Sequence, residues 1–161
     1  MAHLANFRRT RTAAVTGAAV AALVLPFLPK VEGTVLRGYR DPIGVVTACS
    51  GHTLTAALGK AYTPEQCAEL LDVDTAEHAA GVLRCTPGLQ GRTGPLAAAT
   101  SFAFNVGTGA YCRSTMARLF NAGDYVNGCN ELLKWTYAGG RQLPGLVKRR
   151  QAELAICKGV A

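Results

Sequence analysis

The chain has 161 residues, a length that fits one domain and allows a substantial buried core. It carries 17 Lys and Arg against 10 Asp and Glu, and this formal net charge of +7 favours an anionic partner. The basic residues are spread along the chain without any nucleic-acid recognition motif, so no nucleic acid is expected as a partner. Anionic lipid and bacterial cell wall remain as polyanions that suit this charge.

An uncharged run of 18 residues, TAAVTGAAVAALVLPFLP, covers residues 12–29 and follows a basic stretch at 8–11. Its length is at the lower limit for a membrane-spanning helix, and its many alanines make it only marginally hydrophobic. Three interpretations stay open: a cleaved signal peptide, a permanent anchor, or a weak anchor that can leave the bilayer. The residues that follow lack a small-x-small cleavage pattern, so we predict an uncleaved signal-anchor helix within residues 1–30 and a folded domain over 31–161.

Six cysteines, an even number, all lie beyond the apolar run, which predicts disulfides formed in an oxidising compartment. They are Cys49, Cys67, Cys85, Cys112, Cys129 and Cys157. No pair has Cys-x-x-Cys spacing and the three histidines are scattered, so neither a metal site nor a cofactor is expected. Three bridges allow 15 connectivities, and the pattern alone does not choose among them.

A short hairpin is predicted after the apolar run, with strands at residues 39–41 and 45–49. Asp41-Pro42-Ile43-Gly44 between them suits a type I turn, which places Asp41 at the mouth of the hairpin and Thr47 on the returning strand.

Helical signals follow, beginning with a capping box at Thr63-Pro64-Glu65-Gln66. Further helices are predicted over residues 95–106, 114–121, 125–135 and 144–157. A hairpin followed by helices indicates an α+β fold, mainly helical, with a cleft between the hairpin and the helical body.

Two carboxylates and a hydroxyl lie at a defined spacing in the hairpin region. Eight residues separate Glu32 from Asp41, and five residues separate Asp41 from Thr47. Together with Gly51-His52-Thr53, this segment resembles the T4-type phage lysozyme family, glycoside hydrolase family 24, whose catalytic Glu, Asp and Thr have these intervals. The resemblance continues in SFAFNVG at 101–107, in Ser114-Thr115 and NAGD at 121–124, in WTYAGG at 135–140 and in GLVKRR at 145–150.

The resemblance implies a lysozyme fold and hydrolysis of the β-1,4 bond between N-acetylmuramic acid and N-acetylglucosamine in peptidoglycan. Glu32 would be the proton donor, and Asp41 with Thr47 would position the attacking water. This is the arrangement of an inverting enzyme, with carboxyl groups about 6.5–9.5 Å apart. Phe104 and Asn105 would contact the sugar, although Asn105 has a second interpretation, that of joining two helices. The enzyme is expected to be a monomer.

Glu32 lies only three residues beyond Pro29, which ties the candidate acid to the apolar run. While the run spans a membrane, Glu32 would lie at the bilayer surface, separated from a folded cleft. This resembles the signal-anchor-release endolysins, which would place the chain in the host inner membrane with a cytoplasmic amino terminus. It would then move to the periplasm, become active and lyse the host for phage release. No cysteine occurs in residues 1–48, so control by topology is expected and not by disulfide exchange.

Two other functions stay open: a lytic transglycosylase, which needs only the acid, and a membrane-anchored module that binds peptidoglycan without cutting it. The residues Ala48-Cys49-Ser50 replace a Gly-containing turn common in the family and leave the end of the hairpin undetermined. Proximity in the chain favours the pairs Cys49–Cys67, Cys85–Cys112 and Cys129–Cys157. His52 is expected to be structural, Trp135 to belong to the core, and the basic cluster 148–150 to form a solvated helix face.

Overall fold

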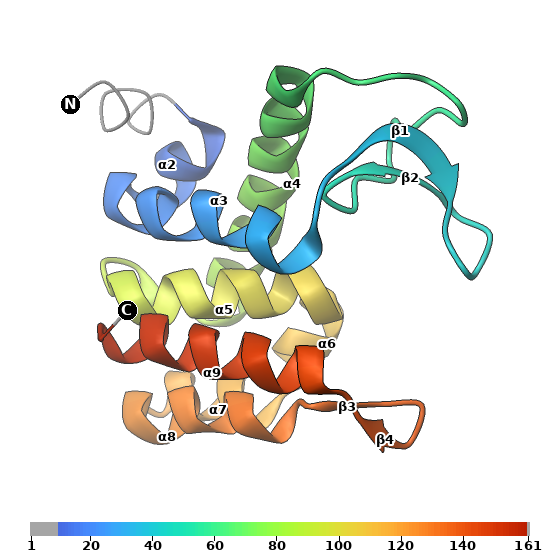
Figure 1. Ribbon diagram of the computed structural model, residues 1–161. Coiled ribbons are helices and arrows are strands. Elements are labelled where there is room, and N and C mark those ends of the chain that lie inside the picture. Colours follow the sequence, from blue (N-terminus) through green and yellow to red (C-terminus); the bar gives the residue numbers. More distant parts are fainter. Residues whose placement is uncertain (1–9, 161) are drawn as a thin grey trace.

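The computed structural model describes residues 10–160, which form a helical body with a β-hairpin projecting from one side (Figure 1). The elements in chain order are α2 (Arg11–Thr16), α3 (Ala18–Glu32), β1 (Val35–Arg40), β2 (Val46–Cys49), α4 (Pro64–Cys85), the 3-10 helix η1 (Pro87–Leu89), α5 (Thr93–Val106), α6 (Thr108–Cys112), α7 (Thr115–Asn121), α8 (Tyr125–Asn130), the 3-10 helix η2 (Glu131–Lys134), β3 (Tyr137–Ala138), β4 (Arg141–Gln142) and α9 (Pro144–Lys158). The predicted fold, mainly helical with a small antiparallel hairpin, is confirmed.

The apolar run forms two packed helices, α2 and α3, with a break at Gly17, whose φ of 95° a residue with a side chain rarely adopts. Asp72 of α4 accepts the first backbone N–H groups of α2, at 2.7 Å from Arg11 and 2.9 Å from Thr12. The buried side of α3 packs against α5, with Val20, Val24 and Leu28 in the same hydrophobic core as the buried residues of α5. None of the helices in the described part of the chain is long and apolar enough to cross a membrane.

The β-hairpin follows α3 after a link of two residues and is antiparallel, with Tyr39 opposite Thr47 and Arg40 opposite Val46. Gly44 donates its backbone N–H to the Asp41 carbonyl at 2.9 Å, so the predicted turn is confirmed. The first strand starts at Val35, earlier than predicted, because the loop 57–62 pairs with the other edge of β1 and extends it.

Gly38 of β1 is required by this close approach. A Cβ added at Gly38 would lie 1.9 Å from the carbonyl oxygen of Ala57, a backbone atom that cannot move independently. We expect Gly38→Ala to lower the free energy of unfolding by about 2 kcal/mol or more, measured by urea denaturation. Gly145→Ala is the matched control, because nothing lies within 4 Å of a Cβ at that position in α9. Equal losses in the two variants would contradict this account.

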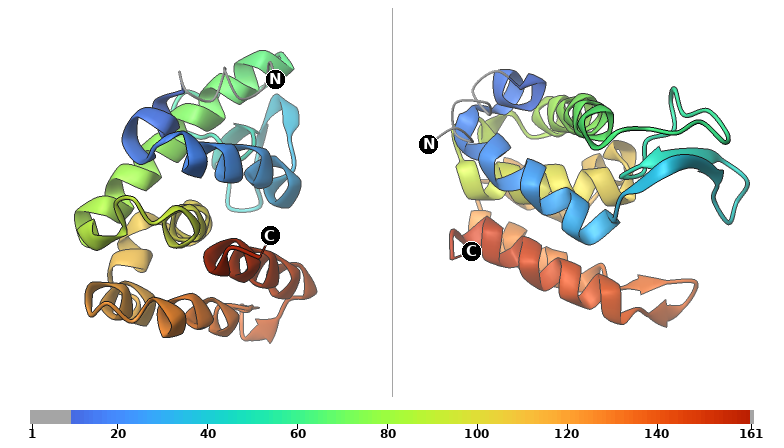
Figure 2. Two further views of the ribbon diagram at one scale, coloured as in Figure 1. Left: turned by 90° about the vertical axis from the view of Figure 1, so that its left-hand side faces the viewer. Right: turned by 45° about the horizontal axis from the view of Figure 1, so that its top comes forward.

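Helix α5 is the centre of the body, because it packs against α3, α4 and α9. It lies between α3 and α9 in the view of Figure 1, and Figure 2 shows the same body from two further directions. Its sequence is apolar nearly all round, as a helix surrounded by others requires, and the residues from Leu96 to Ala103 are all buried. At Gly94 a Cβ would meet the Ile156 carbonyl oxygen at 2.6 Å, so the glycine allows α9 to approach closely.

The three disulfides join Cys49 to Cys67, Cys85 to Cys112 and Cys129 to Cys157, which confirms the predicted pairs. They tie the hairpin to α4, α4 to α6, and α8 to α9. The capping box at Thr63 and Gln66 is also confirmed. The helix predicted over 125–135 is shorter, because α8 tightens into η2 after Asn130.

Candidate active site

Glu32 is the last residue of α3, and Gly33, with a φ of 76°, ends the helix there. The Glu32 side chain is 22% exposed, and its Oε1 accepts a hydrogen bond from Arg149 Nη1 of α9 at 2.5 Å. The end of α3, where it leads into the hairpin, lies on the side of the molecule where α9 begins (Figure 1). A partly exposed carboxyl group beside a cation can meet a ligand from solvent.

Asp41 and Thr47 are held by the hairpin. Asp41 Oδ1 accepts the backbone N–H groups of Ile43 at 3.0 Å and Val45 at 2.8 Å, which fixes its side chain against the turn. Thr47 is 5% exposed and donates its hydroxyl to the Val45 carbonyl at 3.2 Å. No hydrogen bond or ion pair joins Glu32, Asp41 and Thr47 directly, so their joint action stays a prediction.

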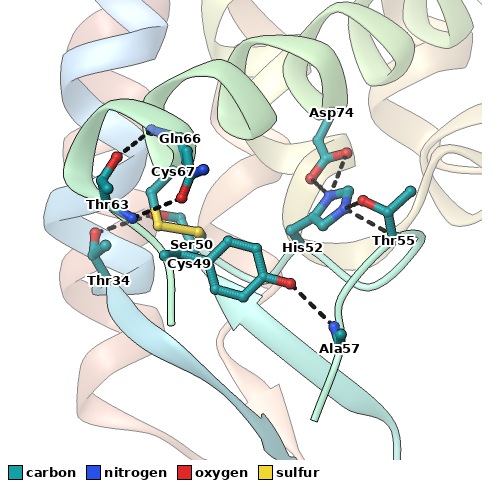
Figure 3. The surroundings of a disulfide bond; sticks show 11 residues. Thr34, Cys49, Ser50, His52, Thr55, Ala57, Thr63, Gln66, Cys67 and Asp74 are labelled. Carbon is teal, nitrogen blue, oxygen red and sulfur yellow. Dashed lines mark hydrogen bonds and ion pairs between the residues drawn. A yellow bond between two sulfur atoms is a disulfide. The ribbon is translucent and has the colours of Figure 1, made fainter. Parts of the chain in front are cut away.

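The end of the hairpin is locked onto α4 (Figure 3). Cys49 has a φ of 56°, a conformation that favours glycine, and its disulfide to Cys67 holds the chain there. His52 is 3% exposed, with Nδ1 at 2.8 Å from Asp74 Oδ2 and Nε2 at 2.8 Å from Thr55 Oγ1. The predicted structural role of His52 is confirmed, and the departure at residues 48–50 replaces a glycine turn with a covalent restraint.

The basic cluster 148–150 differs from its prediction. Lys148 is exposed, but Arg149 and Arg150 are only 5% and 1% exposed, so a solvated helix face was wrong for these two. Successive residues of an α-helix point about 100° apart, so three neighbours cannot share one face. The two arginines face the body. The sequence did not indicate this, because a run of basic residues usually lies in solvent.

A buried carboxylate, Glu153, pairs with both arginines. Glu153 Oε1 accepts from Arg149 Nε at 2.9 Å and from Ser101 Oγ at 2.7 Å, and Oε2 accepts from Arg150 Nη1 at 2.6 Å. Burial lowers the pKa of Arg150 below its ordinary value, and the Glu153 carboxylate opposes that shift. The spacing of Glu153, three and four residues after the arginines, is the one sequence signal for these pairs.

The two candidate sugar-binding residues point to different partners. Asn105 Oδ1 accepts a hydrogen bond from Arg150, which links α5 to α9 and supports its second interpretation. Phe104 lines a cavity of about 410 Å³ between the 51–54 loop, α4 and α6, with its ring 5.2 Å from that of His78. Their contact with a sugar stays a prediction, and Trp135 packs edge-on against Phe102 in the core as expected.

His78 makes the stability of this region depend on pH. Burial lowers its pKa below the ordinary value of 6.5, and Asp74 and Glu77 oppose the shift. The unfolded chain therefore binds the proton more tightly, so the free energy of unfolding rises as pH increases from the folded-state pKa towards 6.5. We expect urea denaturation to show a larger gain between pH 5 and pH 7 in the natural protein than in His78→Asn. Identical pH dependence in the two proteins would disprove this role.

Residues 29–153 match the model of the family described as phage lysozyme, a region that includes Glu32, Asp41 and Thr47. The chain belongs to the phage lysozyme family. It is 39% identical to the SAR-endolysin of Enterobacteria phage PA-2, over 94% of this chain and 95% of that one. It is 37% identical to the SAR-endolysin of Bacteriophage PS119, over 98% and 97% of the two chains.

Solved structures show the same architecture. The muramidase domain of SpmX from Asticaccaulis excentricus superposes with a TM-score of 0.74 at 27% identity, covering 82% of this chain and 92% of that one. The active form of the P1 phage endolysin Lyz superposes with a TM-score of 0.77 at 24% identity, covering 98% and 91%, a likeness of fold. The phage lysozyme is thus a glycoside hydrolase, an endolysin that lyses peptidoglycan.

Proposed function

We propose that this phage lysozyme cleaves the β-1,4 bond between N-acetylmuramic acid and N-acetylglucosamine with Glu32 as general acid. Glu32 gives its proton to the glycosidic oxygen as the bond to the anomeric carbon breaks. A water held by Asp41 and Thr47 attacks that carbon from the opposite face and gives its proton to Asp41. The new hydroxyl then has the inverted configuration.

The observation that carries this proposal is the setting of Glu32, partly exposed and paired with Arg149, at the junction of α3 and the hairpin that bears Asp41. Asp41 Oδ1 is engaged by two backbone N–H groups, and Asp41 Oδ2 makes no hydrogen bond within the described residues. A carboxylate fixed on one oxygen and open on the other suits the orientation of a water molecule.

The products test this mechanism. Purified peptidoglycan is digested in water enriched in oxygen-18, and the new sugar ends are followed by NMR and mass spectrometry. The proposal expects one atom of oxygen-18 in each new reducing end and an initial product of inverted configuration. Retained configuration would exclude the roles of Asp41 and Thr47. An anhydro end without the label would identify a lytic transglycosylase, and no new ends would identify a non-catalytic module.

We further propose that the apolar run anchors the chain in the host inner membrane, with its amino terminus in the cytoplasm, before release into the periplasm. In the folded body, Val20, Val24 and Leu28 are buried against α5, and the same helix ends at Glu32. These side chains cannot lie in lipid and in the core at once, so membrane insertion would prevent the contact between Glu32 and Arg149. Helix α3 continues across the boundary that we predict between the anchor, residues 1–30, and the folded domain, residues 31–161. Release of the anchor from the membrane would therefore be part of the folding of the domain.

A further inference from the structure

Glu32 is the most exposed of four charged residues that ion pairs join into one group. The other members are Arg149, Arg150 and Glu153. Exposure falls from 22% for Glu32 to 5% for Arg149, 1% for Arg150 and zero for Glu153. Arg149 uses different nitrogens for its two carboxylates, Nη1 for Glu32 and Nε for Glu153. The group has two positive and two negative charges, so its net charge is zero.

A buried carboxylate such as Glu153 is an unfavourable choice for stability alone, because desolvation of a charge is costly and an apolar replacement often serves equally well. Glu153 nevertheless has donors on both oxygens, from Arg149, Arg150 and Ser101. Arg149 is further fixed by a 3.2 Å hydrogen bond from Nη2 to the Ser101 carbonyl. These contacts hold the Arg149 guanidinium in one orientation, with Nη1 directed at Glu32.

We propose that Glu153 is a positioning residue for catalysis: it fixes the Arg149 guanidinium and shares the positive charge of Arg149 and Arg150, so that Glu32 is not the only counter-charge of two cations. The inference rests on the proposed role of Glu32 as the acid. Without Glu153, both guanidinium groups would face Glu32 as the one carboxylate left in the group. Uncompensated positive charge beside a carboxyl group opposes its action as a proton donor. The other charged residues to consider are Lys30 on α3 and Asp41 on the hairpin, while α5 contributes only the neutral Ser101 and Asn105.

The test is Glu153→Gln, which keeps the shape of the side chain and removes its charge. We expect kcat on soluble peptidoglycan fragments to fall about tenfold with KM changed less than about twofold, because Glu153 does not touch the substrate. The alkaline limb of the pH profile of kcat is expected to move at least about half a unit towards lower pH.

A buried polar control separates this effect from lost stability. Thr86→Val removes the 2.7 Å hydrogen bond between Thr86 and Tyr111, which lies within the body at the end of α4 and has no contact with Glu32 or the arginines. We expect a lower melting temperature with unchanged kcat and pH profile for Thr86→Val. If Glu153→Gln behaves in the same way, Glu153 is structural and the proposal is overturned.

Two further variants extend the test, and the second, Ser101→Ala, keeps the proposal testable if Glu153→Gln does not fold. The double variant Glu153→Gln/Arg150→Gln restores the net charge of the group and is expected to return the alkaline limb to its natural position. Ser101→Ala removes one donor to Glu153 and is expected to lower kcat about threefold at constant KM. Natural kcat in Ser101→Ala, or a shifted limb in the double variant, would overturn the proposal. Activity retained by Glu32→Gln would instead overturn the proposed role of Glu32 as the acid, on which the role of Glu153 rests.

Discussion

Glu32→Gln is expected to lower the rate of peptidoglycan hydrolysis by about a thousandfold or more while the protein stays folded. The amide keeps the size of the side chain and an oxygen that can accept from Arg149, so the pair with α9 remains satisfied. It has no acidic proton to give to the leaving oxygen. Turbidity loss of purified cell walls and mass analysis of the fragments measure the effect.

Glu65→Gln is the matched control for this substitution. Glu65 lies in the first turn of α4 and is fully exposed, so its loss removes the same charge at a distance from the site. We expect the control to keep natural activity. Wall cleavage by Glu32→Gln at a rate near that of the control would rule out Glu32 as the acid and leave only a binding role for this region.

The sequence was sufficient for those features that depend on local chemistry. The turn at 41–44 and the capping box at Thr63 follow from short patterns, and both are confirmed. The three disulfides follow from pairing neighbouring cysteines, and the choice is confirmed because each cysteine is bonded to its neighbour along the chain, at separations of 18, 27 and 28 residues. The spacing of Glu32, Asp41 and Thr47 matches the catalytic intervals of the family that the segment resembles, and the joint action of these three residues stays a prediction.

The ion pairs that connect Glu32 to the interior could not be predicted from local patterns. Arg149 is 117 residues from Glu32 in the chain, and the packing of both α3 and α9 against α5 brings them together. The same packing buries Glu153 against Ser101 and Arg150 against Asn105 of α5. Long-range charge pairs of this kind depend on tertiary packing, which the identity and spacing of charged residues do not determine.

Ala14→Leu/Ala19→Leu is expected to hold the enzyme in the membrane after the membrane potential is dissipated. Both alanines are exposed in the folded body, so leucine there raises the hydrophobicity of the apolar run without entering the core. Two such changes favour the bilayer by on the order of 1 kcal/mol, enough to lower the released fraction about fivefold. Cell fractionation after depolarisation, followed by the onset of lysis, measures the effect.

Ala14→Gln/Ala19→Gln is the control, since it changes the same exposed positions and lowers the hydrophobicity of the run. We expect this pair to leave the membrane more readily than the natural protein, with lysis that begins earlier. Purified in soluble form, both double variants should cut cell walls at the natural rate, because neither position contacts Glu32 or its partners. If the leucine variant leaves the membrane as fast as the natural protein, the apolar run is not the element that controls release.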